Sequence, residues 1–225
     1  MSQDRAKRNA AEEAVKFVKD GMVIGLGTGS TAKIAVDLIG EKLSKDFKIK
    51  GMPTSIKTKL QAEKLGIELI DIDDQEIIDL AIDGADEVAP DMSLIKGLGG
   101  ALLREKKVEK KAKELIIIVD ENKIVGKLGR GELPVEVSSE SHEVTAVEIE
   151  NTGCKAKLRV ENNGEIFVTD NKNYIYHCLF PNGIENPKEM DEKLQSINGV
   201  RDTGLFVNMA TKIIIGNDEG TRILE

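Results

Sequence analysis

Two kinds of hydrophobic pattern alternate through the first half of the chain, and this alternation limits the folds open to it. Short apolar runs bounded by turn residues are typical of buried strands, and apolar residues at helical spacing are typical of packed helices. Strands that alternate with helices indicate a mostly parallel sheet covered on both faces, so we predict a doubly wound, Rossmann-like α/β fold. The expected strands are 22–26, 47–52, 67–70, 77–82 and 115–119, and the expected helices are 4–19, 32–43, 54–65 and 101–113.

The pattern changes after about Gly129. The order of strand-like and helical segments that follows suggests a small α+β domain of the split β-α-β kind. Asn162-Asn163-Gly164 predicts a tight hairpin turn, because Asn-Gly adopts the positive φ angles that such turns need. The last apolar run, 212–216, is expected to rejoin the first sheet. We therefore predict a larger α/β domain over residues 1–130 and 207–225, and a smaller domain over residues 131–206 inserted near the C-terminus, with strands at 133–137, 155–160, 166–169, 173–180 and 200–206 and helices at 141–151 and 187–197.

The composition argues against several classes of function. A net charge of -8 disfavours a general surface for nucleic acid or other polyanions, so an anionic ligand must be held by local donors. No apolar run approaches the ~18 residues of a membrane helix, and the N-terminal residues lack the apolar segment of a signal peptide. We expect a soluble, cytoplasmic protein with neither a nucleic-acid nor a membrane partner.

Cysteine and histidine are not expected to carry chemistry in this chain. Cys154 and Cys178 fit no zinc pattern, and we expect two small buried thiols, although the spacing leaves a disulfide open. His142 and His177 both fall in the smaller domain, away from the loops described next. A mechanism that needs histidine is therefore disfavoured, and one that uses carboxylates and lysine is favoured.

A glycine-rich segment, Gly-Leu-Gly-Thr-Gly-Ser-Thr at 25–31, follows an expected strand and opens an expected helix. Glycines let the backbone approach a ligand closely, and a helix N-terminus offers free N–H groups with a partial positive charge, so phosphate is the natural guest. The hydroxyls of Thr28, Ser30 and Thr31 add donors around Gly29. Ser30 stands where a dinucleotide-binding motif has its third glycine. The alternative interpretation is a tight turn in which Ser30 or Thr31 caps the helix.

Two aspartates follow the strand 77–82 at the edge where ligands gather in parallel sheets. They lie in the segment Asp83-Gly84-Ala85-Asp86, which is a candidate for proton transfer and substrate contact. The alternative is a solvated acidic turn. Metal binding by the two aspartates lacks support, since no histidine or cysteine lies near them in the sequence.

A second glycine-rich loop begins at Lys96 and continues through Gly97, Leu98 and Gly99 into an expected helix. Lys96 supplies the positive charge that a developing oxyanion needs. Glu105 follows on the first turns of that helix, where burial against Leu102 or Leu103 would raise its pKa towards that of a useful base. The alternative is a solvated face, with Glu109 as a like charge one turn away and with exposed lysines at 106, 107, 110, 111 and 113.

Two further lysines are candidate ligands. Lys123 follows the strand 115–119 and so reaches the same expected edge, where it can bind a substrate hydroxyl or phosphate. Lys7, on the first helix, is a candidate second phosphate contact. For each of them the alternative is an ordinary surface lysine.

Taken together, these motifs closely resemble the A type of ribose-5-phosphate isomerase. The likeness runs essentially end to end, and no position that carries chemistry in that family departs from its pattern. The matching segments are Gly-Leu-Gly-Thr-Gly-Ser-Thr at 25–31, Thr-Ser-Ile-Lys-Thr at 54–58, Asp-Gly-Ala-Asp-Glu at 83–87, the run from Lys96 to Lys106, Asp120 with Lys123, Val-Thr-Asp-Asn at 168–171 and Gly-Leu-Phe at 204–206.

The resemblance implies interconversion of D-ribose 5-phosphate and D-ribulose 5-phosphate, in the pentose phosphate pathway, with no metal or organic cofactor. It implies that Glu105 is the proton acceptor, and it places Thr28–Thr31, Asp83–Asp86, Lys96–Gly99 and Lys123 against the substrate. It also implies a doubly wound sheet with a small ferredoxin-like domain, and a homodimer or homotetramer.

Two alternatives stay open beside this one. A sugar-phosphate sensor of the same fold would need the phosphate loop but not Glu105 or Lys96. It is expected to carry a DNA-binding segment, and no basic helix-turn-helix pattern precedes residue 22. A sugar-phosphate deaminase or lactonase of related fold is disfavoured because no histidine lies near the loops.

Overall fold

The computed structural model describes residues 3–225, which form two compact units. Unit 1 contains the described residues up to Ala85 together with Arg104–Lys123 and Met209–Glu225. Unit 2 contains Asp86–Leu103 and Ile124–Asn208. The sequence prediction gives the smaller domain residues 131–206 alone, whereas the structure also groups 86–103, 124–130 and 207–208 with it. The chain therefore crosses between the units within the segment that holds the two predicted aspartates.

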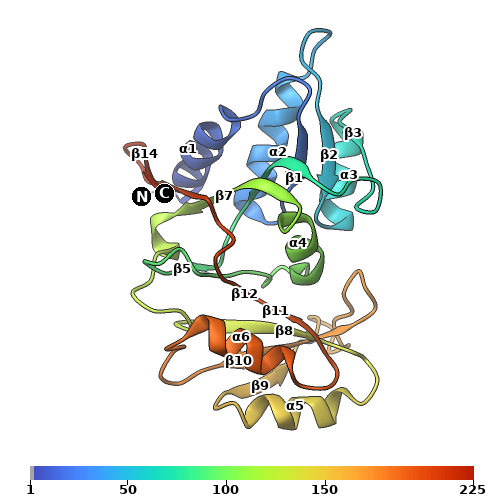
Figure 1. Ribbon diagram of the computed structural model, residues 1–225, viewed down its shortest axis with the longest axis vertical. Helices are drawn as coiled ribbons and strands as arrows, with labels where there is room; N and C mark the ends of the chain where they lie inside the picture. The colour runs from blue at the N-terminus through green and yellow to red at the C-terminus, as the bar shows by residue number, and fades with distance from the viewer. Residues whose placement is uncertain (1–2) are drawn as a thin grey trace. The chain divides into compact units, whose positions relative to one another are not determined.

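Unit 1 is built on a seven-stranded sheet in the order β14-β13-β7-β4-β1-β2-β3 (Figure 1). All neighbours in it are parallel except β13 and β14, which form an antiparallel hairpin at one edge. The predicted return of the last apolar run to this sheet is confirmed, since β13 pairs with β7. The strands are β1 Val23–Leu26, β2 Lys50–Pro53, β3 Glu68–Leu69, β4 Ile78–Asp83, β7 Ala112–Asp120, β13 Lys212–Gly216 and β14 Thr221–Leu224.

Helices cover both faces of this sheet, as the alternating pattern predicts. On β1, Ile24 and Leu26 share one hydrophobic core with alanines of the first helix and apolar residues of the second. Successive strand residues point to opposite faces. A Cβ placed on Gly25 would lie 3.0 Å from Val108 of the fourth helix, so that helix covers the other face. The helices are α1 Gln3–Val15, α2 Ser30–Lys42, α3 Ile56–Lys64 and α4 Leu102–Glu109, with a 3₁₀ turn η1 at Glu121–Lys123. None of the helices within residues 3–225 is long and apolar enough to cross a membrane.

Two predicted helices are too long at their C-terminal ends, and the first of them, 4–19, already stops at Val15. The expected helix 101–113 stops at Glu109, and β7 already begins at Ala112. Pairing of Ala112 with Ile78 on β4 competes with the helical preference of the Ala-Lys-Glu sequence and prevails. The Lys111 ammonium supports the turn by donating to the carbonyl oxygen of Gln75 at 2.9 Å. The charged segment therefore divides between a short helix and a sheet strand.

Unit 2 contains a four-stranded antiparallel sheet in the order β11-β8-β10-β9. Because β10 lies between β8 and β9, the segment forms the predicted split β-α-β arrangement. Its core gathers apolar side chains of both helices and all four strands. The elements, in chain order, are β8 Glu132–Val137, α5 His142–Glu150, β9 Lys155–Leu158, β10 Tyr174–Leu179, α6 Pro187–Gln195 and β11 Val200–Thr203.

A three-stranded sheet in unit 2 was not predicted. It joins β12 Leu205–Phe206, β6 Leu94–Ile95 and β5 Glu87–Val88. Strands of two residues carry too little periodicity to be recognised in a sequence. The predicted strand 200–206 breaks at Gly204, whose N–H donates to Pro134 while its carbonyl oxygen accepts from the N–H of Lys96. The predicted strand 166–169 is also wrong, since Ile166 forms one isolated bridge with Val160 around the turn at Gly164.

The Glu136 carboxylate is a buried charge in unit 2, with 0% of the residue exposed. Its Oε1 accepts hydrogen bonds from Thr169, Asn171 and Asn173 at 2.9–3.2 Å. Its Oε2 is buried with no hydrogen-bond partner among the described residues. Burial raises the pKa of Glu136, against the lowering effect of the three donors.

We predict that Glu136→Gln removes a pH-dependent loss of stability. With a folded-state pKa above the unfolded value, the stability contributed by the protonated carboxyl is present at acidic pH and is lost as pH rises through the folded pKa. Urea unfolding at several pH values measures this effect. The free energy of unfolding of the wild-type protein should decrease as the pH rises above the pKa of Glu136 in the unfolded chain, and that of the variant should not show this decrease. Glu148→Gln, at an exposed position of α5, controls for the loss of one charge. A variant less stable than wild type at neutral pH would contradict the prediction.

Candidate active site

The predicted site residues divide between the two units, and each group is described by itself. In unit 1 they are Lys7, the loop Thr28–Thr31, Asp83, Gly84, Ala85, Glu105 and Lys123. In unit 2 they are Asp86, Lys96, Gly97, Leu98 and Gly99.

The first glycine-rich loop connects β1 to α2 and leaves the N-terminus of α2 without a side-chain cap. The N-cap is Gly29, with a φ of +120° that favours glycine, and no side-chain cap hydrogen bond forms there among the described residues. The alternative in which Ser30 or Thr31 caps the helix is therefore wrong. Gly29 and Ser30 are exposed, while Thr31 is largely buried. The first N–H groups of α2 are placed to receive an anion.

Asp83 fixes this loop from the end of the neighbouring strand. Its Oδ1 accepts hydrogen bonds from the backbone N–H of Thr28 at 2.9 Å and of Gly84 at 2.7 Å. Gly27 approaches so closely that a Cβ there would collide with the Asp83 carboxylate and with the carbonyl oxygen of Ile82. The absent side chain of Gly27 therefore lets β1 and β4 end in contact, and Asp83 is a buried anchor rather than part of a solvated turn.

Three buried carboxylates gather in unit 1. Asp83, Glu105 and Glu109 are between 1% and 3% exposed, and each offers an oxygen within 4.8 Å of the other two. Of the two possibilities that the sequence leaves open for Glu105, burial is the one observed. The alternative of a solvated charged face is wrong for Glu105 and Glu109, and the expected exposure of Lys106 is also wrong, since it is 2% exposed. The cluster therefore places three candidate proton-transfer groups side by side in a buried site.

This cluster also offers the all-oxygen donor set that a hard divalent cation such as Mg²⁺ accepts. The sequence reasoning considered Asp83 and Asp86 for such a role and did not consider Glu109. The prediction that the reaction uses no metal can therefore be tested directly by treating the protein with a chelator.

A cavity of about 300 Å³ adjoins the loop in unit 1. Two exposed lysines of its lining, Lys33 on α2 and Lys57 on α3, were not predicted as site residues. They carry positive charge to the loop in a chain of net charge -8. Lys33 lies within one helical turn of Ser30, and Lys57 lies within one helical turn of Ser55, each at the start of a helix. This spacing is a sequence pattern from which both lysines could have been predicted as site residues. The described lining residues are Thr28, Gly29, Ser30, Lys33, Lys57, Thr58 and Gln61.

The start of α1 lies beside the carboxyl end of β7. The side-chain amide of Gln3 donates to Asp120 at the end of β7, at 3.3 Å. Lys7 follows Gln3 by four residues and so lies on the same helix face. Lys123 ends the 3₁₀ turn that directly follows Asp120. The structure thus brings the segments that carry Lys7 and Lys123 together at one edge of the sheet, next to the strand that ends in Asp83.

In unit 2, Asp86 holds the second glycine-rich loop. Its Oδ2 accepts a hydrogen bond from the N–H of Leu98 at 3.0 Å, and its own N–H donates to Ile95. Lys96 is buried, and its ammonium lies 5.3 Å from the ring centre of Phe206. Gly97 has a φ of +93°, which turns the chain directly after Lys96. The bond from Leu98 to Asp86 therefore joins the end of the Asp-Gly-Ala-Asp segment to the loop that begins at Lys96.

Sequence reasoning missed two residues that support this loop. The Arg159 guanidinium donates to the carbonyl oxygen of Leu98 at 2.9 Å and stacks 3.7 Å from the ring centre of Phe167. Burial lowers the pKa of Arg159. A Cβ on Gly100 would collide with the Phe167 ring, which fixes how closely the loop packs. Both residues come from the segment expected to be an ordinary hairpin, and no pattern there marks them.

Glu87, the last residue of the Asp-Gly-Ala-Asp-Glu motif, has a structural role in unit 2. The buried Glu87 carboxylate accepts the N–H of Gly129 at 2.8 Å and of Gly131 at 2.5 Å. It therefore holds the loop that leads into β8.

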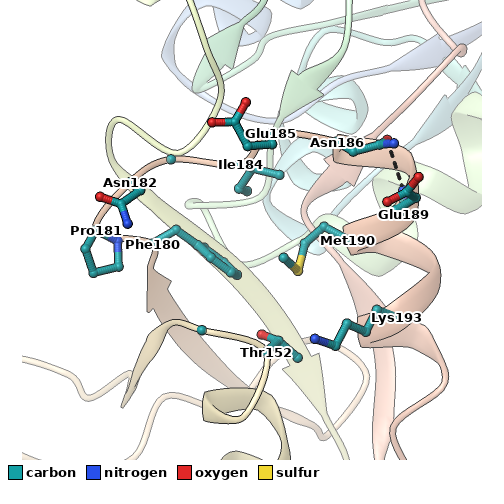
Figure 2. A pocket seen from close by; sticks show the side chains of 12 residues that line it. Thr152, Phe180, Pro181, Asn182, Ile184, Glu185, Asn186, Glu189, Met190 and Lys193 are labelled. Atoms are coloured by element: carbon teal, nitrogen blue, oxygen red, sulfur yellow. Dashed lines mark hydrogen bonds between the residues drawn. The ribbon is translucent and has the colours of Figure 1, made fainter.

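Unit 2 has a cavity of about 380 Å³, and none of the described residues that line it is a predicted site residue. Figure 2 shows Phe180 and Met190 facing each other across it, with Lys193 and Thr152 at one end. The amide of Asn186 accepts from the N–H of Glu189 at 3.3 Å and so caps α6. This cavity is distinct from both loop clusters.

The histidines and cysteines of unit 2 have ordinary protein surroundings. His142 contacts the Tyr176 hydroxyl at 2.8 Å, and His177 contacts Glu132 at 2.7 Å. Cys154 and Cys178 are both buried free thiols, as expected.

The fold and the unit 1 site define a doubly wound α/β protein that presents a glycine-rich loop, a helix N-terminus without a side-chain cap, and buried carboxylates at the carboxyl edge of a parallel sheet. The model of the ribose 5-phosphate isomerase A (phosphoriboisomerase A) family matches residues 50–220, and the chain belongs to this family.

Relatives match over nearly the whole chain. The ribose-5-phosphate isomerase A of Bacillus mycoides is 47% identical over 216 residues, which cover 96% of this chain and 97% of that protein. The solved ribose 5-phosphate isomerase A of Methanocaldococcus jannaschii is 36% identical, with a TM-score of 0.95 and complete coverage of both chains. A solved D-ribose-5-phosphate isomerase in complex with phospho-erythronic acid is 40% identical, with a TM-score of 0.95 and complete coverage of both chains.

We predict that Gly27→Ala disrupts the loop and reduces isomerase activity. The added methyl group has no room beside the Asp83 carboxylate and the Ile82 carbonyl, so the loop or the strand end must move. Overpacking of this kind typically costs about 1–3 kcal/mol of stability. Thermal unfolding and steady-state kinetics measure the two effects. Gly126→Ala, where no atom lies within 4 Å of the new methyl group, is the matched control. A Gly27→Ala variant that matches this control in both measurements would contradict the prediction.

Proposed function

We propose that this chain is an aldose–ketose isomerase that interconverts D-ribose 5-phosphate and D-ribulose 5-phosphate. The observation that carries the proposal is the position of Glu105, buried within 4.8 Å of Asp83, whose Oδ1 holds the glycine-rich loop. The family of the chain and the names of its relatives support this activity.

Catalysis begins with opening of the furanose ring, and Asp83 is our preferred group to move the ring proton. Glu105 then takes the proton from C2 of the open aldose and returns it to C1 through a cis-enediolate. A positioned carboxylate base of this kind contributes about 10²–10⁴-fold to the rate. The neighbouring carboxylates supply the environment in which Glu105 can exchange a proton in both directions of the reaction.

The negative charge of the enediolate requires donors that are already in place. We assign this role to Lys96 and to the N–H groups of Gly97 and Gly99, on the strength of the sequence motif, while the N–H of Leu98 donates to Asp86. One such donor is typically worth about 3 kcal/mol in the transition state. Asp86 holds that loop through Leu98 and, with Gly84 and Ala85, is assigned to contact the sugar hydroxyls.

The phosphate group anchors the sugar away from the reacting carbons. We assign it to the loop Thr28–Thr31, through the N–H groups of Gly29, Ser30 and Thr31, and to Lys7 and Lys123, because the uncapped N-terminus of α2 and two ammonium groups suit a dianion. Binding energy from this non-reacting group orients the substrate for proton transfer. The bound phospho-erythronic acid of a solved relative is itself a phosphorylated sugar acid, which fits a site built for a phosphate and an enediolate.

The sensor alternative explains the phosphate loop but gives no reason to bury three carboxylates together beside it. The isomerase explains both features. A cytoplasmic location and a homodimeric or homotetrameric assembly remain predictions, and light scattering of the purified protein tests the second.

We predict that Glu105→Gln lowers kcat by about 10²–10⁴-fold with little change in KM, because the amide cannot accept the C2 proton while the phosphate contacts remain. Steady-state kinetics with ribose 5-phosphate measure both constants. Glu114→Gln, at an exposed position of β7, is the control for loss of a carboxylate. If the Glu105→Gln variant keeps more than about a tenth of wild-type turnover, Glu105 is not the general base.

We also predict that the reaction needs no metal ion. Protein treated with a chelator, then incubated with ribose 5-phosphate in deuterium oxide, should form ribulose 5-phosphate at the untreated rate. NMR should show partial incorporation of solvent deuterium at C1 of the ketose, because Glu105 can exchange the abstracted proton with solvent before it returns a proton to C1. A rate that falls with chelator and recovers with Mg²⁺ would instead make Asp83, Glu105 and Glu109 a cation site.

A further inference from the structure

The segment Thr54-Ser55-Ile56-Lys57-Thr58 has so far no part in the proposed mechanism, although it is one of the motifs by which the sequence resembles its family. Thr54, Ser55 and Thr58 are all buried at the start of α3. Their three hydroxyls surround the hydroxyl of Thr28 in the glycine-rich loop. We propose that these hydroxyls are positioning groups that hold the phosphate-binding loop, and that the Thr28 hydroxyl bonds to them and not to the ligand. This inference rests on the proposed function of the loop.

The contacts within this hydroxyl cluster, Thr28, Thr54, Ser55 and Thr58, are short. Thr28 Oγ1 lies 2.7 Å from Thr54 Oγ1, 2.9 Å from Ser55 Oγ and 3.1 Å from Thr58 Oγ1. One loop side chain thus meets three hydroxyls from a neighbouring helix start. The loop backbone is also held, because Thr58 Oγ1 donates to the carbonyl oxygen of Gly27 at 2.9 Å and Thr54 Oγ1 donates to that of Leu26 at 3.0 Å.

Counting the hydroxyl protons decides what Thr28 can do. A threonine or serine hydroxyl has one proton to donate. Thr54 and Thr58 can each direct theirs to a loop carbonyl or to Thr28 Oγ1, and Ser55 directs its proton to Thr58 at 3.1 Å. Thr28 directs its proton to Ser55. Every proton of the cluster is used within it, and the N–H of Thr28 is used by Asp83. Neither polar group of Thr28 is then left to donate to a phosphate.

The same cluster forms the start of α3. Ser55 is the N-cap, and its Oγ accepts the N–H of Thr58 at 3.1 Å. The loop is therefore tied on one side to the capped end of α3 and on the other to Asp83 on β4. A loop fixed from two sides presents the N–H groups of Gly29, Ser30 and Thr31 without an ordering cost when the anion binds. Loss of one hydroxyl should weaken anion binding without removing any group that touches the anion.

The test compares Thr58→Val with Thr58→Ser, and it measures binding of inorganic phosphate by calorimetry as well as kcat and KM. Valine keeps the shape of threonine and removes the hydroxyl, whereas serine keeps the hydroxyl. We expect Thr58→Val to weaken phosphate binding and to raise KM by about tenfold, with a smaller change in kcat, and Thr58→Ser to restore both. Thr145→Val is the matched control, since it removes a buried threonine hydroxyl bonded to the carbonyl oxygen of Asn198 in unit 2.

A double-mutant cycle separates positioning from direct contact. If Thr28 acts only through the cluster, Thr28→Val and Thr58→Val should each weaken phosphate binding, and the double variant should be little worse than either. Additive losses, or a Thr28→Val loss far larger than that of Thr58→Val, would mean that the Thr28 hydroxyl contacts the ligand and would overturn the proposal. If Thr58→Val lowers the melting temperature as the Thr145→Val control does and leaves phosphate binding unchanged, the cluster is structural alone and the proposal also fails.

A second variant and a measurement on the wild-type protein complete the test. Should Thr58→Val not fold, Thr54→Val removes a hydroxyl that contacts Thr28 and Leu26 but does not cap α3, and the same outcomes apply. Phosphate binding does not depend on turnover. A wild-type protein that binds phosphate and does not isomerise ribose 5-phosphate would contradict the proposed function and leave this test in force, whereas one that does not bind phosphate at all would overturn the present inference.

Discussion

The carboxylate of Asp83 is the interaction on which the arrangement of unit 1 depends. One of its oxygens accepts the N–H groups of Thr28 and Gly84, so the loop after β1 and the turn after β4 are fixed by the same atom. Hydrogen bonds from N–H groups to an ionised acceptor are about twice as strong as neutral ones. The absence of a side chain at Gly27 permits this contact. The same carboxylate thereby fixes the geometry of the phosphate loop and stands beside the base that we assign to the reaction.

Placing Glu105 and Glu109 with Asp83 in a buried site is costly for folding, and the cost is informative about function. Buried carboxylates are tolerated where they are compensated by hydrogen bonds or positive charge, and they are commonly found where a shifted proton affinity is useful. A surface helix would place residues 105 and 109 in solvent, as the density of charge between Arg104 and Glu114 suggests. The structure instead turns that face of α4 towards the sheet, where Val108 packs against Gly25.

The parallel sheet and its ligand edge could be predicted because they depend on hydrophobic period and on where strands end. Asp83, the loop before α2 and Lys123 follow directly from those two features. The burial of Glu109 and Lys106 could not be predicted, because a helix in which most residues are charged has no clear apolar face to set its orientation. Arg159 and Phe167 were missed because their contacts join segments about 60 residues apart in the chain, as the bond from Arg159 to Leu98 shows. The two-residue strands of the three-stranded sheet are set by neighbours and not by local sequence.

An acidic protein that binds an anionic substrate must solve an electrostatic problem locally, and unit 1 shows how. At a net charge of -8 the long-range field repels a sugar phosphate, and salt screens that field beyond about 8 Å under physiological conditions. Within that distance the proposed site offers backbone N–H groups at the start of α2, and Lys33 and Lys57 line the adjoining cavity. Backbone donors cannot swing towards the nearby carboxylates as lysine side chains can, provided that the loop is rigid. The hydroxyl cluster at the start of α3 gives that rigidity with neutral groups, which adds no charge to compete with the phosphate for its donors.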